Sequence, residues 1–146
     1  MFVQQMLVTA RERLVQVEVH ALVKTVATIM AQPHTDLVVV CDGNILAGVV
    51  TKTDLVAQMG RCDGGACTAR IETVMTRDVV SCRPNDLLAD LWAVMKARGL
   101  QRIPVIDPSR TPVGVIYARD ALQNMLGEVE NEDQLLRDYI GGVGYR

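Results

Sequence analysis

The sequence is poor in aromatic residues and has no strong excess of charge. Phe, Trp and Tyr make up 3% of its 146 residues, and the formal net charge is −2. Proteins that bind nucleic acids usually present clustered basic residues or stacking aromatics, so nucleic acid is not the expected partner. No apolar run reaches the roughly 18 residues that a membrane-spanning helix needs, so we expect no membrane partner either.

The sequence also lacks a recognisable catalytic arrangement. It has two histidines and four cysteines, and no phosphate-binding loop, Ser/His/Asp set or His–Glu metal helix can be placed in it. We therefore expect a protein that is not an enzyme and binds no metal. Few cysteines in an ordinary globular composition, without a convincing signal peptide, are typical of a reduced cytoplasmic protein.

Two of the cysteines, Cys62 and Cys67, lie in a glycine-rich stretch between two more regular segments. They could form part of a metal site or a thiol switch. Zinc usually needs more ligands, in paired short spacings, so ordinary thiols in a loop are the preferred interpretation.

What the sequence does have is an internal repeat. Residues 48–54 read G-V-V-T-K-T-D, and residues 114–120 read G-V-I-Y-A-R-D. The preceding parts of the two copies match at a constant spacing that becomes one residue longer at these motifs. Two copies are too few for a solenoid, so we expect two units packed around a pseudo-twofold axis.

The hydrophobic pattern predicts the same order of elements in both copies, namely strand, helix, strand, strand and helix. In the first copy we expect them at residues 15–19, 21–30, 37–41, 45–50 and from 53 or 54 to 59. In the second copy we expect them at residues 79–82, 86–98, 103–106, 113–117 and 120–126. The run 37–41 is continuously apolar, which is typical of a strand covered on both faces.

This pattern predicts four regions. They are the first repeat with its N-terminal segment (1–60), a linker (61–73), the second repeat (74–126) and an acidic C-terminal helix and tail (127–146). The acidic region is interpreted as a solvated helix with a frayed end, and a partner-binding tail is the alternative.

Three motifs resemble those of cystathionine β-synthase (CBS) domains. The two heptapeptides are similar to the family's G-h-h-[TS]-x-x-D signature, where h is apolar. Residues 102–107 (R-I-P-V-I-D) resemble its R-h-P-V-h-D strand, and residues 74–84 (V-M-T-R-D-V-V-S-C-R-P) resemble the start of a repeat. The resemblance extends over nearly the whole chain up to residue 126.

The resemblance implies an α+β fold of tandem βαββα repeats packed through their sheets, which is called a Bateman module and usually forms dimers. It implies a stand-alone regulatory module that binds an adenosine-containing ligand, such as AMP, ADP, ATP, S-adenosylmethionine or a dinucleotide, and acts on an unknown protein target. No cofactor is required. The alternative is a dimeric interaction scaffold with unused clefts.

The motif suits such a ligand chemically. An ionised aspartate accepts hydrogen bonds from ribose hydroxyls, and a threonine beside a helix N-terminus suits a phosphate. The resemblance implies a first cleft formed by Thr51, Lys52, Asp54, Thr76, Val80, Arg102, Ile103 and Pro104. Three alternatives stay open: Asp54 as a helix cap, Arg102 in a surface ion pair and Pro104 as an edge-strand residue.

The second implied cleft departs from the family pattern. It would contain Val15, His34, Thr35, Asp36, Leu37, Tyr117, Arg119 and Asp120. Tyr117 replaces the small hydroxyl residue, and Asp36 stands where the second repeat has Gln101. We expect Tyr117 to block this cleft partly, although it could instead stack on a base or donate a hydrogen bond to a backbone group. The sequence therefore predicts one tight site per chain, with Asp54 more important than Asp120.

Overall fold

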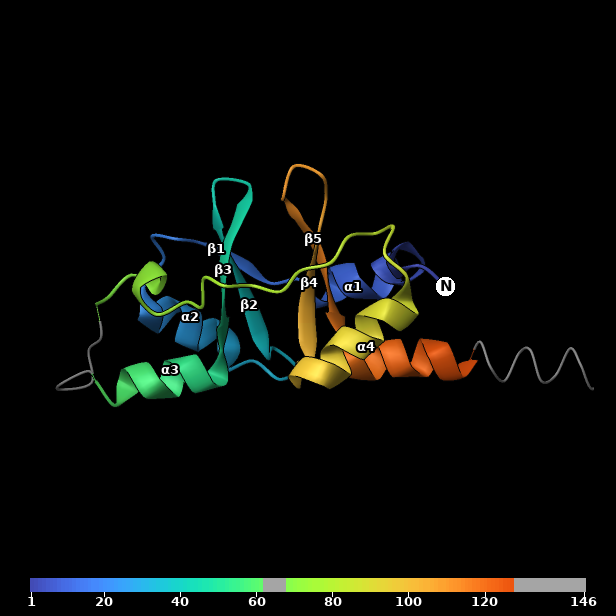
Figure 1. The fold of residues 1–146 in the computed structure, drawn as a ribbon. Coiled ribbons are helices and arrows are strands. Elements are labelled where there is room, and N and C mark those ends of the chain that lie inside the picture. The colour runs from blue at the N-terminus through green and yellow to red at the C-terminus, as the bar shows by residue number, and fades with distance from the viewer. Residues whose placement is uncertain (62–67, 128–146) are drawn as a thin grey trace, which may run out of the picture.

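Two small β-sheets face each other in the computed structural model, which describes residues 1–61 and 68–127 (Figure 1). The first sheet has three strands in the order β1-β2-β3, with β1 parallel to β2 and β3 antiparallel to it. The second is an antiparallel pair, β4 and β5. Helices lie on the outer side of each sheet, α2 and α3 by the first and α1 and α4 by the second (Figure 1), so the expected mixed α+β fold of two repeats is confirmed.

The first unit follows the predicted order of elements. Its elements are β1 (Gln16–Glu18), α2 (Val23–Met30), β2 (Leu37–Asp42), β3 (Ile45–Thr51) and α3 (Lys52–Met59). The second unit contains α4 (Leu88–Arg98), β4 (Arg102–Ile106) and β5 (Pro112–Tyr117), followed by a helix that begins at residue 118 and continues to 127. Both helices that follow the heptapeptides therefore begin earlier than expected.

The predicted strand at residues 79–82 is wrong. This segment makes only one bridge to β4, between Cys82 and Val105. A few residues earlier, Thr76 pairs with Val49 of β3 through two backbone hydrogen bonds of 2.8 and 3.0 Å. The chain thus crosses from one sheet to the other (Figure 1), and a crossing segment cannot run along either sheet long enough to form a strand.

The N-terminal segment is helical, which the sequence analysis did not predict. A 3₁₀-helix (Val3–Met6) leads into α1 (Leu7–Arg13). We grouped this segment with the first repeat along the chain, but it packs against the second unit. Val3, Met6 and Ala10 are buried in the core that contains α4, β4 and β5.

A shared apolar face joins the two units. In β2, Val38 and Val40 face the helices of the first unit, and the alternate residues Leu37, Val39 and Cys41 face the second unit. The strand is therefore buried on both faces, as expected from its continuous apolar run. The cluster between the units consists of Leu37, Val39, Cys41, Leu46, Ile106, Val115 and Tyr117.

The glycine that begins each heptapeptide allows another segment of the chain to approach the sheet closely. A Cβ atom on Gly114 would lie 2.7 Å from Cβ of Ala10 and 3.0 Å from its carbonyl oxygen. A Cβ atom on Gly48 would lie 2.8 Å from the carbonyl oxygen of Thr76. The glycines thus hold α1 and the crossing segment against the sheets.

Some predictions fall outside the described residues. These concern residues 62–67 of the proposed linker, with Cys62 and Cys67, and the acidic region after residue 127. The described part of the linker contains a 3₁₀-helix (Ile71–Thr73). Within residues 1–61 and 68–127, no helix has the length and apolar character needed to cross a bilayer.

We expect Gly114→Ala to destabilise the protein by about 1–3 kcal/mol, because the added methyl group overpacks the contact with α1. Gly60→Ala is the control, since its Cβ atom would come no closer than 3.5 Å to another atom. Urea unfolding measures both. The double variant Ala10→Gly/Gly114→Ala should recover part of the loss, and no recovery would contradict the steric explanation.

Candidate functional site

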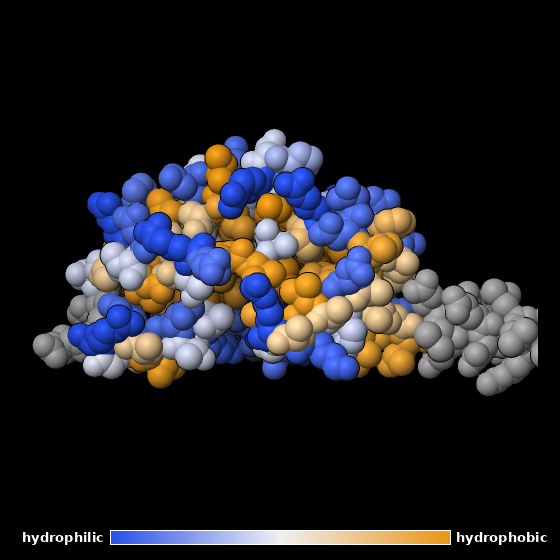
Figure 2. All heavy atoms as spheres, viewed as in Figure 1, coloured by the Kyte–Doolittle hydropathy of each residue, from blue (hydrophilic) through white to orange (hydrophobic). Residues whose placement is uncertain are grey.

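A cavity of about 210 Å³ opens where the crossing segment passes over both sheets. Apolar residues gather along the middle of this face (Figure 2). The structure brings together five residues of the predicted first cleft: Thr51, Thr76, Val80, Arg102 and Pro104. The other lining residues are Leu37, Val49, Asp78, Val79 and Leu100.

Asp54 lies at the first turn of α3, next to this cavity, and caps the helix together with Thr51. The Thr51 hydroxyl accepts a hydrogen bond from the Asp54 amide at 3.3 Å, and Oδ2 of Asp54 accepts one from the Thr51 amide at 2.9 Å. The Thr51 hydroxyl also lies 3.1 Å from Oδ2. In the described part of the chain, Oδ1 of Asp54 has no hydrogen-bond partner. The capping alternative is therefore realised, and one carboxylate oxygen is still available.

Asp36 bridges the two cations that we assigned to the first cleft. Its Oδ1 lies 3.3 Å from Nζ of Lys52, and its Oδ2 lies 3.4 Å from a terminal nitrogen of Arg102. Burial opposes ionisation of Asp36, but the Lys52 hydrogen bond and the charges of Arg102, Lys52 and Arg119 outweigh it. Together they hold the pKa of the carboxyl below its ordinary value of 3.8.

This arrangement corrects the sequence analysis, which assigned Asp36 and Leu37 to the second cleft. Leu37 lines the first cavity because it pairs with Thr51 across β2 and β3. Asp36 precedes it and therefore lies beside Lys52, the residue after Thr51. The ion-pair alternative for Arg102 is realised, although Arg102 also lines the cavity.

Ile103 does not line the cavity and lies fully buried in the core of the second unit. Successive strand residues point to opposite faces, so Arg102 and Pro104 reach the cavity whereas Ile103 cannot. The same alternation could have predicted Val49, which lies two residues before Thr51 in β3.

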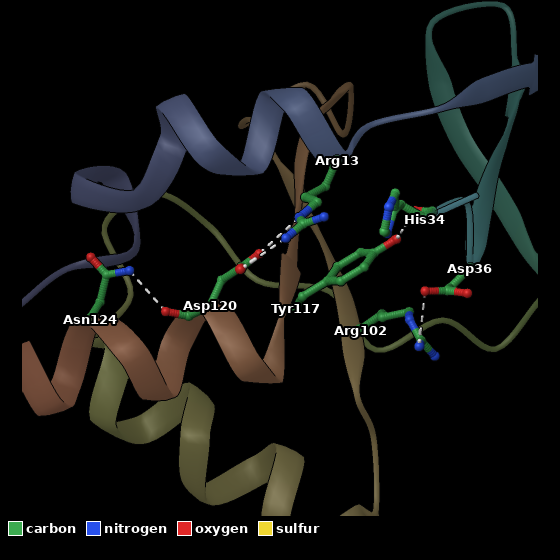
Figure 3. A network of polar contacts seen from close by, with 7 residues as sticks. All are labelled: Arg13, His34, Asp36, Arg102, Tyr117, Asp120 and Asn124. Carbon is green, nitrogen blue, oxygen red and sulfur yellow. Dashed lines mark hydrogen bonds and ion pairs between the residues drawn. The ribbon is translucent and has the colours of Figure 1, made fainter. Parts of the chain in front are cut away.

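The second predicted cleft is occupied by the chain itself (Figure 3). Arg13, at the end of α1, donates two hydrogen bonds of 3.0 Å, one to each carboxylate oxygen of Asp120. These bonds are the main reason that the pKa of Arg13 is raised above its ordinary value. Asp120 is 7% exposed, so the aspartate expected to bind ribose is buried in an internal ion pair.

Tyr117 fills the space beside this pair. Its side chain is buried, and its ring faces the guanidinium groups of Arg13, Arg102 and Arg119 at 4.7, 5.3 and 5.5 Å. Its hydroxyl donates a long hydrogen bond of 3.5 Å to the His34 carbonyl (Figure 3). A ring surrounded by cations is stabilised by cation–π attraction. Tyr117 therefore has a structural role in the contact between the two units.

The remaining residues of the second prediction do not converge on one cavity. Val15 accepts a backbone hydrogen bond from Val39, and Thr35 donates one to Gln32. Arg119 and Tyr117 line a different hollow of about 360 Å³, together with Trp92, Gln101, Arg102, Ala118 and Leu122. This hollow was not predicted, because its residues belong to separate motifs.

Two cysteines lie in the described part of the chain, and both are free and buried. Burial raises the pKa of Cys41, and burial with the nearby Asp86 raises that of Cys82 to about 12. Thiols with raised pKa values are poor nucleophiles and metal ligands. Among residues 1–61 and 68–127, no group of three or more His, Cys, Asp or Glu side chains is placed to hold a metal ion.

Comparison with known proteins gives one family. The family model of the CBS domain matches residues 6–61 and 71–127. The CBS-domain protein ATU1752 of Agrobacterium tumefaciens superposes with a TM-score of 0.72 at 23% identity, covering 86% of this chain and 99% of that one. The CBS domain pair of protein MJ0100, solved with 5′-methylthioadenosine and S-adenosyl-L-methionine, superposes with a TM-score of 0.70 at 18% identity, covering 88% and 97%.

Curated relatives include both small and large proteins. The CBS domain-containing protein YhcV of Bacillus subtilis is 25% identical over 71% of this chain and 73% of its own length. The inosine-5′-monophosphate dehydrogenase of Nitrosopumilus maritimus is 27% identical over 73% of this chain. The chain spans only 21% of that dehydrogenase and 22% of a homoserine O-acetyltransferase from Methanococcoides burtonii.

We expect Arg13→Gln to cost about 1.5–3 kcal/mol of unfolding free energy, because it leaves the buried Asp120 carboxylate without its charged partner. Arg70→Gln is the matched control. Arg70 forms an exposed 3.8 Å ion pair with Glu72, which should contribute less than about 1 kcal/mol. Denaturant unfolding compares the two variants. Equal losses of unfolding free energy would show that the Arg13–Asp120 pair does not stabilise the fold more than an exposed ion pair does.

Proposed function

This chain belongs to the CBS domain family, and we propose that it is a regulatory module that binds one adenosine-containing ligand and thereby changes its docking to a protein partner. The observation that carries the proposal is the convergence of Thr51, Thr76, Val80, Arg102 and Pro104 on one cavity between the units. The bound adenosyl compounds of the MJ0100 domain pair support this ligand class.

The walls of the cavity suit the parts of an adenosine. Val49, Val79 and Leu37 provide an apolar lining for the base. The ribose would lie against α3, where Oδ1 of Asp54 can accept a hydrogen bond without breaking the helix cap. Binding between two units that contact one another would change how firmly they are held together, which is a means of regulation.

We propose a regulatory rather than a catalytic role. The chain accounts for about a fifth of two larger relatives that are named as enzymes, which supports an accessory function of the shared part. The module would then act on a protein target, which is the role expected from the sequence.

The alternative, an interaction scaffold, is favoured by apolar side chains on the helices. Val56 and Met59 of α3 are 66% and 67% exposed, and Leu122 and Leu126 of the last helix are 40% and 52% exposed. Exposed apolar side chains on the helices of both units are typical of an interface. They support the homodimer predicted from the sequence, and a mass of 16.0 kDa in light scattering would refute it.

We expect Asp54→Asn to weaken binding of the best adenosyl ligand by about ten- to a hundredfold, which is the loss of one charge-assisted hydrogen bond. Asp120→Asn is the matched control at the same motif position, and it should change affinity less than about threefold because Arg13 already binds Asp120. A thermal-shift screen of adenosyl compounds identifies the ligand, and calorimetry measures the affinities. A larger loss at Asp120 would contradict the assignment of the site.

A further inference from the structure

We propose that Asp36 makes the first cavity selective for adenosyl compounds without a 5′-phosphate. The inference rests on the proposed function, since it concerns the ligand class of the same cavity. It starts from the position of the Asp36 carboxylate, which holds Lys52 with one oxygen and Arg102 with the other.

Arg102 lines the cavity and Lys52 follows the lining residue Thr51, so these are the cations placed to meet a phosphate bound there. Both already have a carboxylate partner within 3.4 Å. A phosphate that approached these two cations would either displace the Asp36 carboxylate or be repelled by it. Displacement would leave Asp36, whose side chain is 25% exposed, without its charge partners in a half-buried position.

The other charges around the cavity do not favour an anion either. Asp78 lines the cavity, and Asp54 is hydrogen-bonded to Thr51, which also lines it. The carboxylates of Asp36, Asp54 and Asp78 equal in number the cations Lys52, Arg102 and Arg119, whose charges all reach Asp36, so no cation is left in excess for a phosphate. Two like charges about 6 Å apart repel by more than about 1 kcal/mol at the effective dielectric constant of a protein surface. The site favours a neutral or cationic group where a nucleotide carries its phosphate.

A thioether or a sulfonium meets this requirement. A neutral thioether at the 5′ position leaves the Asp36 ion pairs intact. A sulfonium also gains attraction to the carboxylates. A 5′-phosphate has neither advantage, because its charge is repelled by Asp36 and its cationic partners are occupied.

The test compares 5′-methylthioadenosine with AMP, which share the adenosine part and differ in charge at the 5′ position. Calorimetry in buffer without divalent cations measures both affinities for the intact protein, for Asp36→Asn and for Asp42→Asn. Asp42 is exposed at the opposite end of the same strand, so its variant changes the net charge equally without touching the cavity.

We expect the unmodified protein and Asp42→Asn to bind 5′-methylthioadenosine at least about tenfold more tightly than AMP. Asp36→Asn should reduce this preference by about tenfold, mainly through tighter AMP binding.

Equal or tighter binding of AMP by the unmodified protein would overturn the inference, and this result does not depend on how the variants fold. A preference that Asp36→Asn leaves unchanged would also overturn it. If neither the unmodified protein nor a variant binds either compound, the proposed function itself fails and the inference fails with it.

Discussion

The structure depends on the apolar contact between the two sheets. β2 and β4 are buried on both faces, so neither unit could leave the other without exposing the side chains of Val39, Ile106 and Val115 to water. Because the sheets meet face to face, the ends of β3 and β5 come close to the partner unit. The contact therefore creates two possible clefts, one at each heptapeptide.

The two clefts differ because a tyrosine replaces a threonine. Thr51 caps α3 and engages Asp54 through one oxygen, which leaves an open cavity beside it. Tyr117 has no hydroxyl close to its backbone, so Asp120 has no such capping partner and pairs with Arg13 instead. The N-terminal helix supplies Arg13 because Gly114 lets it approach the sheet. The pseudo-symmetric fold thus has one open and one self-occupied site.

The sequence predicted the repeated units from their periodicity, and the family resemblance supplied five of the ten residues that line the first cavity. It missed α1 and misplaced Asp36, because both depend on contacts between units that no local pattern records. The strand expected at residues 79–82 failed for the same reason, since the path of that segment is set by two sheets at once. The buried position of Ile103 could have been predicted from the sequence, because strand alternation alone excludes its side chain from the cavity.

The central claim is that, of the two clefts at the heptapeptides, the one at Thr51 is open to an adenosyl ligand and the one at Tyr117 is closed. Its most direct test is the number of ligand molecules bound per chain at saturation, measured by calorimetric titration of active, folded protein with the best adenosyl compound. The account predicts one molecule per chain, and a second site only when Arg13 and Tyr117 are replaced together by Ala and Thr. Two sites of equal affinity in the unmodified protein would contradict it.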